Sequence, residues 1–174
     1  IKKVGDGGGS EAVLTRVTQI SSALGVSKTG EQFKAELKTK FDMAAAGHDD
    51  QNKKRPRVLF LLSAKDGTPV AAGGETDAAS IIKLAGAENA VSGFEGYKPL
   101  SSEVAAASGA DYILMMDHVV KSSGGKDIIL NLPQIKMTPA GQNGKLIAMD
   151  GLLLLGFGPR TPDAIEQLSN QFNQ

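Results

Sequence analysis

The sequence contains no cysteine, and this absence removes three kinds of chemistry at once. It excludes a disulfide framework, a thiolate metal site and a thiol nucleophile, and it leaves the redox compartment open. Net charge is absent as well, because 19 Lys and Arg residues stand against 19 Asp and Glu residues. A zero net charge argues against a nucleic-acid-binding protein that works by neutralising phosphates, so we expect no nucleic-acid partner.

No apolar run approaches the roughly 20 residues that a membrane-spanning helix needs. The first residues do not resemble a secretory signal, because Lys2 and Lys3 are not followed by an apolar region. We therefore expect either a cytosolic protein or a processed chain. Residues 1–10 have the glycine-rich composition of a flexible linker, and we interpret them as a linker or as the remnant of an upstream lobe.

The patterns that catalysis usually requires are also missing. The sequence has no G-x-S-x-G nucleophile elbow, no dinucleotide-binding fingerprint after its first apolar run, and two histidines without zinc-ligand spacing. Asp66 and Asp117 are candidate paired carboxylates, although an aspartate in a turn is more often structural. These absences favour a binding protein over an enzyme.

Apolar residues at helix spacing predict two helices before any strand. The first is expected to start at a Ser10 cap and to stop at Gly25, and the second to begin at about Gly30. We interpret residues 11–55 as a helical connector that leads into a separate lobe.

From Pro56 onward the pattern changes to alternating strands and helices. Continuous apolar runs at residues 58–62, 112–116 and 146–149 are typical of strands covered on both faces, and residues 70–72 and 89–91 are candidate short strands. Caps at Thr76, at Ser101 or Ser102, and at Thr161 predict the intervening helices. The fold class predicted for residues 56–174 is α/β, a Rossmann-like three-layer lobe with a mainly parallel central sheet.

The loop at residues 93–103, GFEGYKPLSSE, is the most informative segment for function. It presents Tyr97 next to Lys98 and leads into a helix whose first turn carries Glu103, where a negative charge suits the positive helix end. Tyr97 has three interpretations: it packs over a neighbouring helix, it stacks on a flat ligand, or its phenolate binds a hard metal.

Other polar side chains are expected at the carboxyl ends of the strands, the edge at which parallel sheets bind ligands. They are Lys65, His118 and Arg160. Arg160 lies in a stiff FGPRTP turn. Its guanidinium either stabilises that turn by donating hydrogen bonds to backbone carbonyls, or it donates two parallel hydrogen bonds to a ligand carboxylate.

Three segments, RVLFLLS, GYKPLSSE and LLGFGPRTP, together with the sequence between them, resemble the carboxyl-terminal half of periplasmic haem-binding proteins. These proteins are the substrate-binding components of bacterial haem ABC importers, and they belong to a wider group (class III) with two α/β lobes joined by one long helix. The resemblance covers nearly everything from Ser10 onward, and the second and third segments are its most specific parts.

The resemblance implies a role for several residues. Tyr97, with Lys98 beside it, would face the cleft between the lobes and touch the ligand, and Arg160 would support an iron-ligating tyrosine or a haem propionate. Glu103 would dock on basic residues of the inner-membrane permease. His118 matches no motif of the family and is only a candidate metal ligand. The implied location is the periplasm.

The chain departs from the family in one respect, because the amino-terminal lobe and its iron-ligating tyrosine are not in the sequence. Half a cleft buries only one face of a ligand, so we predict that the chain folds but binds haem weakly or not at all. Two other classes remain open: a cobalamin- or ferric-siderophore-binding protein of the same fold, and a stand-alone α/β enzyme.

Overall fold

Six strands form one sheet within residues 9–46 and 54–172, the parts of the chain that this computed structural model describes. The strand order is β4-β2-β1-β5-β6, and β3 pairs with the start of β1 outside this path. β1 runs parallel to β3 and β5, and β5 runs parallel to β6. β2 is antiparallel to both of its neighbours, β1 and β4. The predicted mainly parallel sheet is confirmed. The strands are β1 (Arg57–Ser63), β2 (Val70–Ala72), β3 (Glu88–Asn89), β4 (Tyr97–Pro99), β5 (Tyr112–Met116) and β6 (Leu146–Met149).

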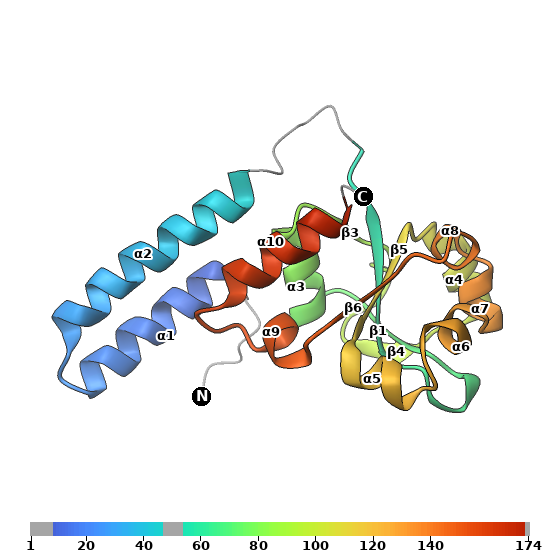
Figure 1. Cartoon of the computed structure of the whole chain (residues 1–174), viewed down its shortest axis with the longest axis horizontal. Coiled ribbons are helices and arrows are strands. Elements are labelled where there is room, and N and C mark those ends of the chain that lie inside the picture. Colours follow the sequence, from blue (N-terminus) through green and yellow to red (C-terminus); the bar gives the residue numbers. More distant parts are fainter. Residues whose placement is uncertain (1–8, 47–53, 173–174) are drawn as a thin grey trace.

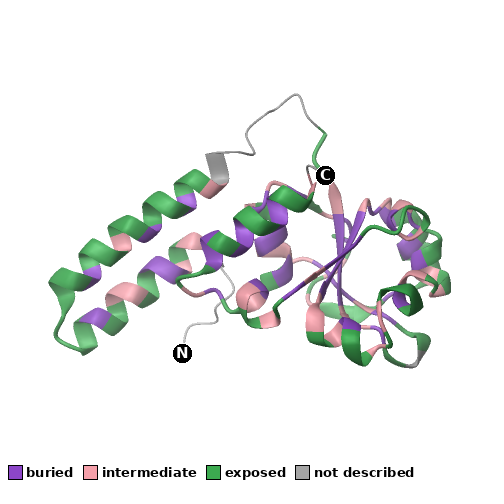
Figure 2. Cartoon of the chain, in the orientation of Figure 1, coloured by how far each residue is buried: buried purple, intermediate pink, exposed green. Residues whose placement is uncertain are grey.

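The central strands are buried on both faces, as their continuous apolar runs predict. Side chains of a strand alternate between the two faces, so each run divides between two core clusters. Val58 and Phe60 of β1 lie in what we call the first core cluster, and Leu59 and Leu61 lie in the second core cluster on the other face. Figure 2 shows the buried residues concentrated along these strands and on the helix surfaces that face them.

Helices cover the sheet on both sides and complete the three predicted layers (Figure 1). The helices of the first core cluster are α1 (Ser10–Ala23), α2 (Ser27–Ala46), α3 (Asp77–Leu84), α9 (Gly151–Leu155) and α10 (Thr161–Phe172). The second cluster is covered by α4 (Ser102–Ser108), α5 (Asp117–Ser122), α6 (Lys126–Leu130), α7 (Pro133–Lys136) and α8 (Pro139–Gln142).

α1 and α2 form a helical hairpin that projects from the α3–α10 side of the sheet (Figure 1). Val13 of α1 and Phe41 of α2 reach the first core cluster, so the hairpin shares a core with the lobe. The second helix begins at Ser27 rather than near Gly30. Gly30 lies inside α2, where a Cβ would stand 2.1 Å from the Ser21 Oγ, so the glycine allows the two helices to pack closely. The division between a connector (11–55) and a lobe (56–174) remains a prediction.

The predicted helix caps are partly correct. Thr76 accepts a hydrogen bond from the Ala79 N–H, and Ser101 accepts one from the Val104 N–H, so both cap their helices. Ser10 and Thr161 are not caps, because each is already the first residue of its helix, and Gly9 holds the cap position of α1 without a side-chain bond.

The loop that was expected to carry Tyr97 is a short edge strand. Tyr97 opens β4 and pairs with Ala72 of β2. Backbone hydrogen bonds that join Gly73 and Gly74 to residues 94–96 hold the two segments together beyond this pair. Gly73 has no room for a side chain, since a Cβ would stand 2.1 Å from the Phe94 carbonyl oxygen. The strand expected at residues 89–91 is the shorter β3, which begins one residue earlier and ends at Asn89. Residues 1–8, with most of the predicted linker, and His48 lie outside the described residues.

In the described ranges, none of the helices combines the length and the apolar composition that crossing a bilayer would require.

Candidate functional site

The carboxyl ends of β1, β5 and β6 lie at one edge of the sheet, because these three strands are parallel and adjacent. Lys65 follows β1, Asp117 and His118 follow β5, and Asp150 follows β6. In α/β sheets this edge is where ligands bind. Lys65, Asp117 and His118 therefore follow the carboxyl ends of their strands, as expected from the sequence, and Asp150 joins them there.

The cross-strand register determines which way Tyr97 points. Its partner Ala72 belongs to the first core cluster, and directly paired residues of neighbouring strands direct their side chains to the same face. Tyr97 thus faces the layer of α3, α9 and α10. The turn that carries Arg160 joins α9 to α10 in this same layer, so both residues belong to one side of the sheet.

The surroundings of Tyr97 favour a neutral phenol. Tyr97 is an exposed residue, with 40% of its surface accessible, so the rest of it is covered by its neighbours. Burial raises the pKa of the phenol above its ordinary value of 10.0, and the negative charge of Asp77 at the start of α3 raises it further. Both effects favour the protonated phenol in the ligand-free chain, the form that can stack on a ligand or donate a hydrogen bond.

Lys98 points to the opposite face of the sheet from Tyr97. It pairs with Ala71, a member of the second core cluster, and its Nζ lies 5.3 Å from the centre of the Phe94 ring. This distance fits a cation–π contact. The structure therefore does not bring Lys98 and Tyr97 together on one surface, although the two are adjacent in sequence.

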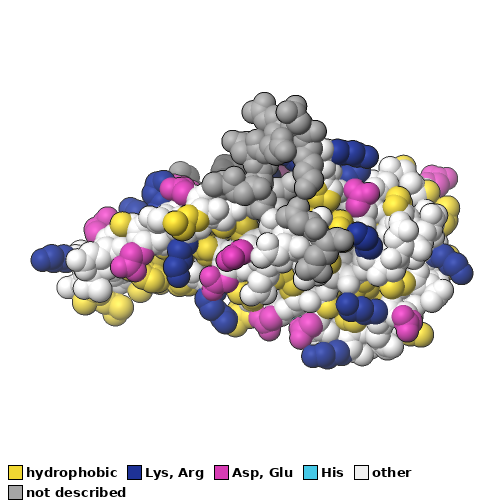
Figure 3. Space-filling model, turned by 45° about the horizontal axis from the view of Figure 1, so that its top comes forward, with side chains coloured by type: hydrophobic (Ala, Val, Ile, Leu, Met, Phe, Trp, Pro, Cys, Tyr) yellow, Lys and Arg dark blue, Asp and Glu magenta, His cyan; other side chains and the backbone are white. Residues whose placement is uncertain are grey.

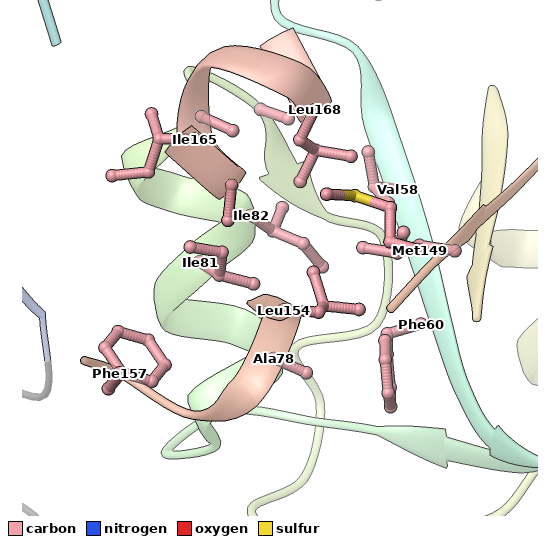
Figure 4. Packing of buried hydrophobic residues seen from close by; sticks show 14 of the residues in the cluster. Val58, Phe60, Ala78, Ile81, Ile82, Met149, Leu154, Phe157, Ile165 and Leu168 are labelled. Carbon is pink, nitrogen blue, oxygen red and sulfur yellow. The ribbon is translucent and has the colours of Figure 1, made fainter. Parts of the chain in front are cut away.

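Arg160 lies in a corner that we define as residues 156–160. Figure 4 shows Phe157 at the end of the first core cluster, on the side of Ile81 and Ala78, where its ring anchors the corner. The Arg160 carbonyl accepts hydrogen bonds from the N–H groups of Asp163 and Ala164, so its backbone fixes the first turn of α10. Its side chain is exposed, and among the described residues no hydrogen bond or ion pair engages the guanidinium.

The backbone of the corner is unusual at two positions. Phe157 has a φ of 41°, a left-handed conformation that is uncommon outside glycine. Gly156 has no space for a side chain, because a Cβ would stand 2.3 Å from the Leu152 carbonyl oxygen. The path of the chain into Arg160 is therefore constrained by local sterics and by the buried ring.

His118 lies in the first turn of α5 with 66% of its side chain exposed. Its Nδ1 is 3.8 Å from the Asp117 Oδ1, and its ring lies over Gly151, where a Cβ would approach the Cε1 to 3.1 Å. The part of the chain that is described has no cluster of three or more His, Asp or Glu residues able to hold a metal ion. His118 as a metal ligand remains a prediction.

The arrangement around Asp117 does not suit general acid catalysis. Its carboxylate accepts a hydrogen bond from the Lys121 Nζ at 3.3 Å and another from the His118 N–H at 2.7 Å. Both contacts lower the pKa of Asp117 below its ordinary value, the first more strongly. A catalytic acid needs the opposite shift. The side chain of Asp66, its proposed carboxylate partner, lies outside the described residues.

Glu103 is exposed in the first turn of α4, as predicted. It makes no ion pair with any described residue, so its charge is available to a partner molecule. Elsewhere the surface mixes both signs of charge, and Figure 3 shows Lys and Arg interspersed with Asp and Glu on the viewed face.

Two hollows lined by described residues have volumes of about 390 and 380 Å³, and neither of these two is lined by Tyr97 or Arg160. The first lies between α2 and α10 and includes Lys40 and Glu166, and the second follows the exposed edge of β6.

Two contacts, one at Tyr97 and one at the corner, could not be found by reading the sequence. Asp77 influences Tyr97 from 20 positions away, and Arg16 of α1 donates a hydrogen bond from its Nη1 to the Phe157 carbonyl oxygen at 3.2 Å. These pairs are far apart in sequence, and no local motif marks either of them.

Comparison with known proteins identifies the group to which the fold belongs. The sequence profile of the family described as "Periplasmic binding protein" matches residues 3–152. A comparison with curated proteins found no match.

Several solved structures are similar over almost the whole chain. The periplasmic heme-binding protein BhuT, solved with two hemes, is 34% identical over 93% of this chain, with a TM-score of 0.88. The periplasmic heme-binding protein RhuT from Roseiflexus sp. RS-1, in its apo form, is 34% identical over 94% of the chain, with the same TM-score. The periplasmic heme-binding protein HutB of Vibrio cholerae is 29% identical over 95%, with a TM-score of 0.84.

The matched region is only part of each relative, since the chain spans 62%, 63% and 64% of the lengths of BhuT, RhuT and HutB. Over the matched part, TM-scores of 0.88 show that this chain has the same fold as BhuT and RhuT. Because the family profile covers most of the chain and two relatives exceed 30% identity, the chain belongs to the periplasmic binding protein family.

Proposed function

We propose that this chain forms one wall of a haem-binding cleft in the periplasmic component of a bacterial haem ABC importer, and that it is not an enzyme. The observation that carries the proposal is its 34% identity, over more than nine-tenths of the chain, to the heme-binding proteins BhuT and RhuT.

Haem combines a flat apolar ring with two carboxylates, and the surface offers a complement to each. Tyr97 supplies an exposed aromatic ring, and an aromatic ring suits stacking on a porphyrin. Arg160 supplies an exposed guanidinium with no partner in the described parts of the chain, and such a fork binds carboxylates through paired charge-assisted hydrogen bonds. Both residues lie on the α3–α10 side of the sheet.

A haem titration tests the proposal. Because one wall covers only one face of the ligand, the 174-residue chain is expected to bind haem weakly or not at all, whereas the complete gene product that carries these residues binds it tightly. The measurement is the intense absorbance band of bound haem. Tight tyrosinate-type ligation in the 174-residue chain would contradict the one-wall interpretation, and failure of the complete gene product to bind would contradict haem as the ligand.

The role of Arg160 is tested by changing the ligand as well as the protein. Arg160→Ala in the complete gene product should weaken haem binding about ten- to a hundredfold, the range expected for losing a charge-assisted hydrogen bond. Haem dimethyl ester has no free carboxylate, so its affinity should not depend on Arg160. Lys34→Ala is the matched control, because Lys34 is a hairpin cation that lies near Glu31 at 4.0 Å and is remote from the corner. If Arg160→Ala lowers the affinity for haem and for its dimethyl ester equally, Arg160 does not bind the propionates.

The role of Tyr97 is tested by two substitutions in the same assay. Tyr97→Phe keeps the ring and should retain most of the affinity, whereas Tyr97→Ala removes the stacking surface and should weaken binding clearly. If the two variants lose affinity equally, and the spectrum of bound haem changes in both, the hydroxyl is the important group and Tyr97 ligates iron.

We also propose that Glu103 docks the protein on basic residues of the permease. The supporting feature is an exposed, unpaired carboxylate in the first turn of α4. Glu103→Lys should lower haem import while leaving haem affinity unchanged, and Asp127→Lys is the control, because it makes the same charge change in the first turn of α6. An unaltered import rate for Glu103→Lys would count against docking through this residue.

The same absorbance measurement distinguishes bound haem from a bound cobalamin or ferric siderophore, because neither of these compounds gives the haem band. The identities above favour haem, since BhuT, RhuT and HutB are all named as heme-binding proteins.

A further inference from the structure

We propose that Arg16 is a positioning residue for Arg160: it holds the carbonyl of Phe157 and thereby fixes the corner from which Arg160 reaches the carboxylate of a ligand. This inference rests on the proposed function. It links the helical hairpin to the ligand-facing surface, a connection that neither the sequence patterns nor the family comparison identifies.

The starting point is the hydrogen bond between Arg16 and Phe157. The Nη1 of Arg16 donates to the Phe157 carbonyl oxygen at 3.2 Å, and the two residues are 141 positions apart in sequence. In the described chain Arg16 has no carboxylate partner. This contact is therefore the polar interaction that the structure assigns to its side chain.

The acceptor lies at the least relaxed point of the corner. Phe157 has a φ of 41°, which is unfavourable for a residue with a side chain, so the conformation needs support from its surroundings. One support is the ring, which is packed in the first core cluster with 4% of the residue exposed (Figure 4). The hydrogen bond from Arg16 is the second support, and it acts on the backbone itself.

The chain between Phe157 and Arg160 has little freedom to absorb a displacement. Gly158 accepts a hydrogen bond from the Thr161 N–H at 3.0 Å, and Pro159 has a φ fixed by its ring. The Arg160 carbonyl is bonded to two amides of the first turn of α10. On the other side, Gly156 is bonded through its N–H to the Leu152 carbonyl at 3.0 Å and has no room to move closer to it.

A shift of the Phe157 carbonyl is therefore passed along a stiff segment to Arg160. The donor sits on α1, next to Val13 and Val17, which pack against the first core cluster. The position of the hairpin and the position of the ligand-facing guanidinium are coupled through this one hydrogen bond.

A double-mutant cycle in the complete gene product tests the coupling through haem affinity. Arg16→Ala should weaken haem binding about five- to tenfold, in the range expected for losing a partly exposed hydrogen bond from a charged donor. In an Arg160→Ala background the same substitution should have almost no further effect, because Arg16 acts through Arg160. Arg16→Lys, which retains one donor, should restore part of the affinity. Equal losses in both backgrounds, or no loss in either, would overturn the proposal.

A second measurement does not depend on haem. In the 174-residue chain, nitrogen-15 relaxation should show increased backbone mobility at Gly158 and Arg160 after Arg16→Ala, and no change after the control Lys34→Ala. An unchanged corner would overturn the positioning role even if affinity fell. If the complete gene product without substitutions binds no haem, the proposed function fails. The nitrogen-15 relaxation measurement on the 174-residue chain then still decides whether Arg16 holds the corner.

Discussion

The stiffness of the corner at residues 156–160 can be tested by adding a single methyl group at one of two glycines. In Gly156→Ala the new Cβ would stand 2.3 Å from the Leu152 carbonyl oxygen, about 1 Å inside ordinary van der Waals contact. Gly158 is the matched control, because it lies two residues away, has no positive φ, and no heavy atom beyond its chain neighbours lies within 4 Å of where its Cβ would stand.

The expected magnitudes follow from these distances. Overpacking of this kind costs about 1–3 kcal/mol, and the reduced freedom of the unfolded chain on replacing glycine by alanine offsets about 0.4–1 kcal/mol of it. Gly156→Ala should therefore lower the free energy of unfolding by about 1–2 kcal/mol and the Tm by roughly 2–8 °C. Gly158→Ala should leave the stability unchanged or raise it by about 0.4–1 kcal/mol.

Urea unfolding followed by circular dichroism measures both variants in the 174-residue chain. The reasoning would be refuted by equal effects of the two substitutions, since the structure gives them opposite signs. In the haem assay, Gly156→Ala should also weaken binding, because relieving the contact with Leu152 displaces the backbone that carries Arg160.

Three further predictions concern the hairpin, the aromatic residue of the site and a helix cap. Gly30→Ala should destabilise the chain by about 1–3 kcal/mol, because its Cβ would collide with the Ser21 side chain, and Ser21→Gly should rescue much of the loss in the double variant; urea unfolding checks both. The Tyr97 phenol should titrate above its ordinary pKa of 10.0, with Asp77→Asn moving the midpoint down, as measured by the difference in phenolate absorbance between parent and Tyr97→Phe. Because the folded-state pKa is the higher one, the contribution of this group to stability is present below pH 10 and is lost as the pH rises through the folded-state pKa. Thr76→Ala should cost about 1–2 kcal/mol in thermal unfolding, because this buried hydroxyl caps α3.

The secondary structure was largely readable from the sequence because its signals are local. Continuous apolar runs identified β1, β5 and β6, and Thr76 and Ser101 identified two helix starts through side-chain caps. The errors also have local causes. Ser10 and Thr161 are cap-forming residue types that lie one position inside their helices, and a residue type alone does not distinguish these two positions.

The site was predicted as a list of residues, and its geometry was not. Tyr97 and Lys98 are neighbours in sequence, yet they point to opposite faces because a strand alternates its side chains. Residues 93–103 were predicted to be a loop, and a loop does not have this alternation of side chains. β4 becomes a strand only by pairing with β2, a contact between segments about 25 residues apart.

What the sequence determined by itself is the layered α/β plan, the chemical character of each candidate residue and the resemblance to haem-binding proteins. These depend on periodicity and motifs within a few residues of one another. Only the tertiary structure decided that Tyr97 and the Arg160 corner share one side of the sheet, that burial and the charge of Asp77 raise the pKa of the Tyr97 phenol, and that Arg16 reaches Phe157. The physical reason is that electrostatic and hydrogen-bonding contacts depend on distance in space, and folding brings together residues that are far apart along the chain.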